Sequence, residues 1–158
     1  MERGAGVKGA KRKTRTPALT YDAVGDDRAG RRMKVMEKAR TFEDLWVWQE
    51  ARASAKSVYK DFGPGTPGER DYGFRNQIQA AAVSVMNNPA EGFERTSDAE
   101  FARYCDIAKG SCGEVRSMYY LAEDLGYVSP ATAEERRNRA RQISAGLASL
   151  IRHLRKDR

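Results

Sequence analysis

The sequence predicts an all-α fold: an antiparallel, up-down-up-down four-helix bundle preceded by a disordered basic N-terminal tail. Apolar residues recur at helical spacing in four segments, glycine or proline interrupts the chain between them, and no alternating strand pattern occurs anywhere. Short connections favour antiparallel neighbours, and 158 residues suffice for one domain with a core. We therefore assign residues 1–40 to the tail and residues 41–158 to the bundle domain.

The tail carries the net charge of the chain. Residues 1–40 contain 12 Lys and Arg against 5 Asp and Glu, whereas residues 41–158 contain 17 of each. Such a segment buries too little apolar surface to offset its ordering entropy, so we expect it to be disordered. Three interpretations stay open: a nucleic-acid-binding arm, a solvated tail without a role, and translation that begins at Met33 or Met36.

The first helix is predicted from about Phe42 to Phe62, with Thr41 as the N-cap. Trp46 and Trp48 lie about 200° apart at helical spacing, so both cannot face the same core. Residues 63–68 form a loop rich in glycine and proline. The residues that share one apolar arc are Leu45, Trp48, Ala51, Ala55, Val58, Tyr59 and Phe62.

The second helix is predicted from about Glu69 to Glu91, with a centre rich in Ala and Val. Pro89 lacks the backbone donor of a helix and clashes with the carbonyl four residues earlier. We therefore expect the helix to kink or end near Asn87 and Asn88.

The third helix has the clearest ends, because Ser97 and Glu100 form a capping box and Gly126 supplies a stop. It has two apolar stripes, so it needs more than one packing partner. Gly110 and Gly113 each cost about 1 kcal/mol relative to Ala, and a close backbone contact would explain them. The first stripe is Phe101, Tyr104, Ala108, Cys112, Val115, Tyr119 and Ala122; the second is Ile107, Met118, Leu121 and Leu125.

The fourth helix begins at the N-cap Ser129 and Pro130. Its apolar seam is Ala140, Ile143, Leu147, Leu150 and Leu154, at the spacing of a coiled coil. The opposite face is basic: Arg136, Arg137, Arg139, Arg141, Arg152, Arg155 and Lys156. This face is either solvated or a phosphate-contacting stripe, and the candidate contacts are Arg137, Arg141, Arg152 and Lys156.

Large apolar residues away from the core stripes predict contacts between subunits. The candidate oligomer interface is Trp46, Gly110, Met118 and Leu121. The aromatic set that lies partly off the core stripe could stack bases instead: Trp46, Tyr72, Phe74 and Phe93.

No residue pattern predicts catalysis. Helix-dipole complementarity explains Glu134 and Glu135, and we assign no chemistry to Glu91 and Glu94. The stretch from residue 88 to 95 is either an exposed binding turn or a set of helix caps around the kink. We therefore expect no enzyme activity.

The two cysteines also favour a structural role. Cys105 and Cys112 lie about 10 Å apart along a helix, too far for a disulfide, so we expect buried, reduced thiols. Cys112 lies on the core stripe, which argues against a nucleophile with His153 as base. With a single histidine, a Cys/His metal cluster cannot form, and we expect neither metal nor cofactor. Neither a long apolar run nor a secretory signal occurs, which predicts no membrane contact and a cytoplasmic location.

Several strings of residues match one known family. They are Asp44-Leu45, Val47-Trp48-Gln49, Ala51, Ala81-Ala82-Val83-Ser84-Val85, Asn88, Ala90-Glu91-Gly92-Phe93, Arg95, Phe101, Ile107-Ala108-Lys109-Gly110-Ser111, Glu114 and Leu125-Gly126-Tyr127. From about Thr41 to Leu154 the chain resembles the four helix bundle protein family, also called the S23 or 23S rRNA intervening-sequence protein family. This family includes the accessory variability proteins of diversity-generating retroelements.

The resemblance implies an antiparallel four-helix bundle assembled as a homopentamer with a central channel. For the retroelement branch it implies binding to a reverse transcriptase and to RNA or DNA, whereas the intervening-sequence branch has no established activity. The chain departs from the family at Gln79 and Ala80, where basic residues are usual, and at Pro89 and Trp46. The first departure weakens a nucleic-acid role for the second helix.

Two functions remain open from the sequence. The first is a non-catalytic, oligomeric accessory protein that associates with nucleic acid or a nucleoprotein complex. The second is a protein-protein interaction scaffold without nucleic-acid binding. The steep salt dependence of phosphate contacts would separate them.

Overall fold

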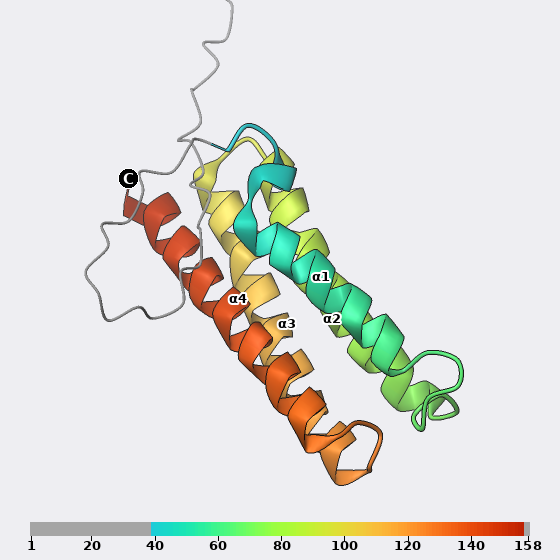
Figure 1. The fold of residues 1–158 in the computed structure, drawn as a ribbon. Coiled ribbons are helices and arrows are strands. Elements are labelled where there is room, and N and C mark those ends of the chain that lie inside the picture. Colours follow the sequence, from blue (N-terminus) through green and yellow to red (C-terminus); the bar gives the residue numbers. More distant parts are fainter. Residues whose placement is uncertain (1–38, 157–158) are drawn as a thin grey trace, which may run out of the picture.

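Four long helices form the computed structural model, which describes residues 39–156. Figure 1 shows that successive helices run in opposite directions, so the bundle is antiparallel and up-down-up-down. Within residues 39–156 there is no strand, and the predicted all-α class is confirmed. Expectations about the tail fall outside the described residues. The elements are a 3-10 turn η1 (Phe42–Asp44) and the helices α1 (Trp46–Asp61), α2 (Tyr72–Glu94), α3 (Asp98–Asp124) and α4 (Pro130–Lys156).

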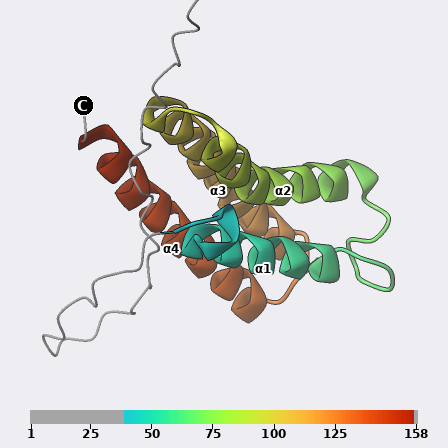
Figure 2. The same cartoon turned by 90° about the horizontal axis from the view of Figure 1, so that it is seen from above.

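The helix α3 lies at the centre of the packing. It packs extensively against α4 on one side and α2 on the other, and α1 packs mainly against α2. The contact between α1 and α4 is small, so the bundle closes only weakly on that side. Figure 2 shows the C-terminal half of α4 extending away from α1.

Local capping signals set the ends of α3 and α4 where the sequence predicts them. The Ser97 hydroxyl accepts a hydrogen bond from the Glu100 backbone N–H at 3.3 Å, and Ser129 accepts one from Thr132 at 3.1 Å. Gly126 adopts a positive φ of 71°, and the next N–H, that of Tyr127, returns to the Ala122 carbonyl at 2.8 Å. This reversal is a glycine C-cap, so both the start and the stop of α3 are confirmed.

The first helix begins later than predicted. Thr41 precedes the 3-10 turn, and the Asp44 carboxylate accepts hydrogen bonds from the backbone N–H groups of Arg40 (2.8 Å) and Thr41 (3.0 Å). The helix α1 then starts at Trp46 after the extended residue Leu45. Thr41 therefore caps a short turn that leads into α1.

Of the two outcomes expected near Asn87 and Asn88, a kink or an end, the end is wrong, because α2 continues through Pro89 to Glu94. Pro89 is fully buried, and packing of its ring stabilises the helical path. The Asn88 amide also donates to the Ser84 carbonyl and hydroxyl, both at 2.9 Å, and these bonds link two successive turns of the helix before the proline. Tertiary packing here outweighs the loss of one backbone hydrogen bond.

The core consists mainly of the predicted stripes. In α4 all five residues of the predicted apolar stripe, from Ala140 to Leu154, are buried. Cys105 and Cys112 of α3 are buried as well. Among the arc residues of α1, Tyr59 differs and is 51% exposed. Trp46 and Trp48 are both half-buried and both pack against the core cluster, from different sides of α1.

Candidate interaction surfaces

The Arg137 side chain is covered by its neighbours and is not on an open surface. Its side chain is 6% exposed, and Nη1 and Nη2 lie 2.5 Å and 2.9 Å from carboxylate oxygens of Glu123 and Glu134. Its guanidinium carbon also lies 4.1 Å from the ring centroid of Tyr120. This placement corrects the phosphate role expected for Arg137, because a buried guanidinium between two carboxylates is not free to neutralise a phosphate.

The other three predicted phosphate contacts are exposed. Arg141 donates to Asn138 at 2.5 Å and to the Tyr120 hydroxyl at 3.3 Å, and it lies 3.5 Å from Glu134. Arg152 and Lys156 form no ion pair within the described part of the chain. They lie close to the C-terminus of α4, where cations also complement the helix dipole.

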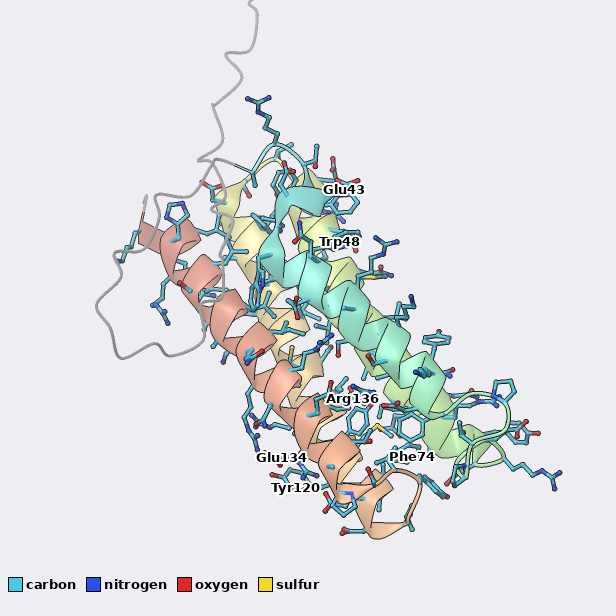
Figure 3. All side chains as sticks on the ribbon, viewed as in Figure 1. Glu43, Trp48, Phe74, Tyr120, Glu134 and Arg136 are labelled. Atoms are coloured by element: carbon cyan, nitrogen blue, oxygen red, sulfur yellow. The ribbon has the colours of Figure 1, made fainter. Side chains whose placement is uncertain are left out.

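A second set of charged residues fastens the opposite side of α4 to the core. The Arg136 guanidinium binds both carboxylate oxygens of Asp61, at 2.8 Å and 3.1 Å, and the buried Tyr119 hydroxyl donates to the same carboxylate at 2.8 Å. These residues join α1, α3 and α4. Figure 3 shows Arg136 on the side of α4 that faces α1, whereas Glu134 and Tyr120 lie together on the other side. Burial, and then the Asp61 carboxylate, raise the pKa of the Tyr119 hydroxyl.

The predicted second stripe of α3 divides into exposed and buried residues. Ile107, Leu121 and Leu125 are 46%, 47% and 49% exposed, and they share the face of α3 that points away from the core. Met118 is only 9% exposed and packs into the core cluster, so the expectation that it lies in a subunit interface is corrected. Met118 lies seven residues after Ser111 and four after Glu114, which both hydrogen-bond residues of α2, so helical spacing turns its side chain towards α2.

The glycines of α3 have no close contact within the protomer. A Cβ atom added to Gly110 or Gly113 would meet nothing within 4 Å. Gly110 therefore lies open on the exposed apolar face, which we define as Ile107, Gly110, Leu121 and Leu125 and call the α3 apolar face. Trp46, the fourth predicted interface residue, lies between α1 and α4, where its ring packs against Gly146. Only the exposed edge of the Trp46 ring could therefore contact a second subunit.

Residues 88–95, which could be a binding turn or a set of helix caps, make structural contacts between α2 and α3. Gly92 approaches α3 so closely that a Cβ atom would stand 2.8 Å from the Phe101 ring. The Tyr104 hydroxyl donates to Glu91 at 2.9 Å, and Arg95 donates to Tyr104 at 2.7 Å and also pairs with Glu91. These hydrogen bonds lower the pKa of the Glu91 carboxyl, the one from Tyr104 having the largest effect.

Cys112 and Ser111, which were considered for catalysis, take part in the packing between helices. Burial raises the pKa of the Cys112 thiol to about 12, so the thiolate form is scarce near neutral pH. The Ser111 hydroxyl hydrogen-bonds the Ser84 hydroxyl at 2.7 Å, between α3 and α2. Within residues 39–156 no group of three or more His, Cys, Asp or Glu residues could hold a metal ion. In the same range no helix is long and apolar enough to cross a membrane.

Fold and surfaces together define a small antiparallel four-helix bundle protein with an exposed apolar face on its central helix. The chain belongs to the 23S rRNA-intervening sequence protein family, whose model matches residues 43–149. The resemblance expected from the sequence is confirmed to that extent. No curated protein matches the chain.

A solved structure shares the fold. It is the crystal structure of a protein with unknown function from the S23 ribosomal protein family of Bacteroides thetaiotaomicron. It is similar to this chain with 21% sequence identity and a TM-score of 0.61, over 66% of this chain and 97% of that one. At this identity the likeness supports the four-helix fold alone.

Proposed function

We propose that this protein is a non-catalytic accessory protein that self-associates through the α3 apolar face and binds RNA. The observation that carries the proposal is the exposure of Ile107, Leu121 and Leu125 on the helix that otherwise forms the centre of the core. Each of these side chains leaves about half of its surface in water, and their common face favours a partner. Gly110, with open space above it, would allow the backbone of a partner helix to approach closely.

A second copy of the chain is the partner we propose. In a cyclic ring the interface is heterologous, so the α3 apolar face of each subunit would be buried against a different surface of the neighbouring subunit. The homopentamer implied by the family resemblance is the assembly that we expect. The cytoplasm is the location that we propose, because buried free cysteines suit a reducing compartment.

Association with RNA is supported by the description of the family, which refers to 23S rRNA, and by exposed cations. Arg152 and Lys156 have no carboxylate partner among the described residues, so their charge is available to phosphates. In an assembly these cations repeat around the symmetry axis, and weak contacts add up through multivalency.

Light scattering on the purified full chain at about micromolar concentration tests self-association, with an oligomeric mass as the expected result. Leu121→Asp should shift the mass towards that of a monomer, because a carboxylate on this face opposes burial. Tyr59→Asp, on an exposed aromatic residue of α1, is the matched control and should leave the mass unchanged. A wild-type chain that stays monomeric would contradict the proposal.

A protein-interaction scaffold without nucleic acid is the second candidate, with a reverse transcriptase as the partner in the retroelement branch. The near balance of charge in residues 41–158, with 17 cations and 17 acids, favours this candidate. The absence of RNA retention by the full chain at low salt, where phosphate contacts are strongest, would select it over the RNA proposal.

A further inference from the structure

The helices α3 and α4 keep one antiparallel register along the solvent-exposed side of their contact. This side is distinct from the buried apolar stripe of α4. Arg155 pairs with Asp106 near one end of this side, and Arg141 donates to the Tyr120 hydroxyl at 3.3 Å near the other. Fourteen residues separate the two positions on each helix, so the antiparallel register is constant between them. Positions between these contacts can therefore be paired by counting along the helices.

This register brings cations and small residues together. Lys109 is level with Arg152, Arg116 is level with Ala145, and between these pairs Gly113 is level with Ala148. All six residues are exposed or half-buried. We call this set, Lys109, Gly113, Arg116, Ala145, Ala148 and Arg152, the α3–α4 seam.

The middle of the seam is open. A Cβ atom on Gly113 would meet nothing within 4 Å, and Ala148 opposite carries only a methyl group. Small residues here leave a shallow strip between the two cationic positions. A chain of phosphates could lie close to the helices there without displacing a side chain.

The positive charge of the seam is not compensated. Lys109, Arg116 and Arg152 form no ion pair with the described residues. The nearest acids at the two ends are engaged, Asp106 by Arg155 and Glu123 by Arg137. Between these ends α3 contains one further acid, Glu114, which accepts a hydrogen bond from Gln77 on the α2 side.

The α4 side of the seam carries no negative charge at all. From Arg136 to Lys156 the helix contains no Asp or Glu. On the α3 side, Lys109 and Arg116 both oppose the effect of burial on the pKa of the Cys112 thiol, which places both cations near the same part of α3. The sequence alone assigned the basic residues of α4 to one face and did not include Lys109 or Arg116.

We propose that the α3–α4 seam binds the phosphate backbone of an RNA strand, with Lys109, Arg116 and Arg152 as the phosphate contacts. This inference rests on the proposed RNA association. Lys109 and Arg116 lie seven residues apart, about 10 Å along the helix axis, so the two cations can contact different phosphates of one strand. One face of the Tyr120 ring is occupied by Arg137, so base stacking contributes little and binding tolerates different sequences.

The test compares two triple variants of the full chain by fluorescence anisotropy with a labelled single-stranded RNA of about 20 nucleotides. Lys109→Gln/Arg116→Gln/Arg152→Gln should weaken binding more than tenfold near 100 mM salt. It should also reduce the slope of log affinity against log salt by about 2, at about 0.7 per phosphate contact. Lys56→Gln/Lys60→Gln/Arg70→Gln removes the same charge from exposed positions outside the seam and should have little effect on either quantity.

A charge reversal gives an independent check. Gly113→Glu places a carboxylate in the floor of the seam, where there is space for it, so the fold should be retained and RNA affinity should fall. Thermal unfolding of each variant verifies the fold. Equal losses of RNA affinity in the two triple variants would overturn the seam as the binding site. A seam variant that binds RNA as tightly as the wild-type chain would also overturn it.

The failures of the two proposals are distinguishable. A wild-type chain that does not bind the RNA at low salt contradicts the proposed function itself. A chain that binds RNA with no dependence on the seam contradicts only this inference. A DNA strand of the same length that binds as tightly, or polyglutamate that binds more tightly through the same cations, would overturn the assignment to RNA.

Discussion

The indole ring of Trp46 lies directly against the backbone of Gly146, so α1 and α4 meet where no side chain separates them. A Cβ atom at Gly146 would stand 2.7 Å from Trp46 Cζ3 and 2.8 Å from Val47 Cγ1. The contact between these two helices is otherwise small, which makes this approach important for closing the bundle.

Gly146→Ala should therefore destabilise the fold. The added methyl group must displace the Trp46 ring, and we expect the free energy of unfolding to fall by about 1–2 kcal/mol even though Ala favours helix more than Gly. Urea unfolding at fixed protein concentration measures the change. The control is Gly113→Ala, at an open helical position, which should raise the free energy of unfolding by up to about 1 kcal/mol. The same sign of change in both variants would contradict the close-approach argument.

Asp61 accepts hydrogen bonds from both Arg136 and Tyr119. Removing its carboxylate should therefore lower the free energy of unfolding more than removing the Tyr119 hydroxyl alone. Tyr119→Phe deletes one hydrogen bond and should lower the free energy of unfolding by about 1 kcal/mol. Asp61→Ala leaves a mostly buried guanidinium and a buried hydroxyl without their acceptor, and should cost about 3 kcal/mol. The double variant should cost less than the two single changes added together, as coupled partners do. Additive losses in denaturant titrations would show that the three groups act independently.

Asp71 should contribute to the acid sensitivity of the fold. Its carboxylate accepts hydrogen bonds from the Phe74 backbone N–H at 3.1 Å and the Tyr127 hydroxyl at 2.8 Å, and the first of these lowers the Asp71 pKa most. Because the pKa of Asp71 is lower in the folded chain than in the unfolded chain, its carboxylate stabilises the fold at pH values above the unfolded pKa of about 3.9. This stabilisation is lost as the pH falls through the lower pKa of the folded chain. Asp71→Ala should lower Tm at neutral pH, and the difference from wild type should shrink below about pH 4. A difference that is the same at all pH values would contradict this linkage.

The two thiols should report on global opening of the bundle. Cys105 and Cys112 are buried, and the pKa of Cys112 is raised to about 12 by burial. A thiol reagent at about pH 8 should therefore react with neither cysteine in the native chain and with both in denaturant. Rapid modification of the native chain would show that α3 separates readily from its neighbours.

Signals confined to a few neighbouring residues were predicted correctly from the sequence. Ser97, Ser129 and Gly126 fix helix ends through hydrogen bonds to residues at most five positions away, so their effect is visible in the sequence. Pro89 shows the limit of such rules, because burial of its ring keeps α2 helical where the local sequence favours an end.

Surface assignments depended on register, which the sequence does not specify. Arg137 belongs to a basic face on a helical wheel, yet its guanidinium meets Glu123 of α3 only because of how the two helices are aligned. Met118 is buried for the same reason, since α2 covers its side of α3. Lys109 and Arg116 were overlooked because their relation to Arg152 appears only once α3 and α4 are set side by side.

The polar contacts between α2 and α3 limit how the length of this hairpin can change. Ser84 meets Ser111 and Glu91 meets Tyr104, so matched partners recur after seven residues on both helices. An insertion of one or two residues inside either helix would rotate every later position away from its partner. Relatives that keep these pairs should therefore differ in hairpin length by whole heptads, and other insertions should gather in the connection between Phe62 and Asp71.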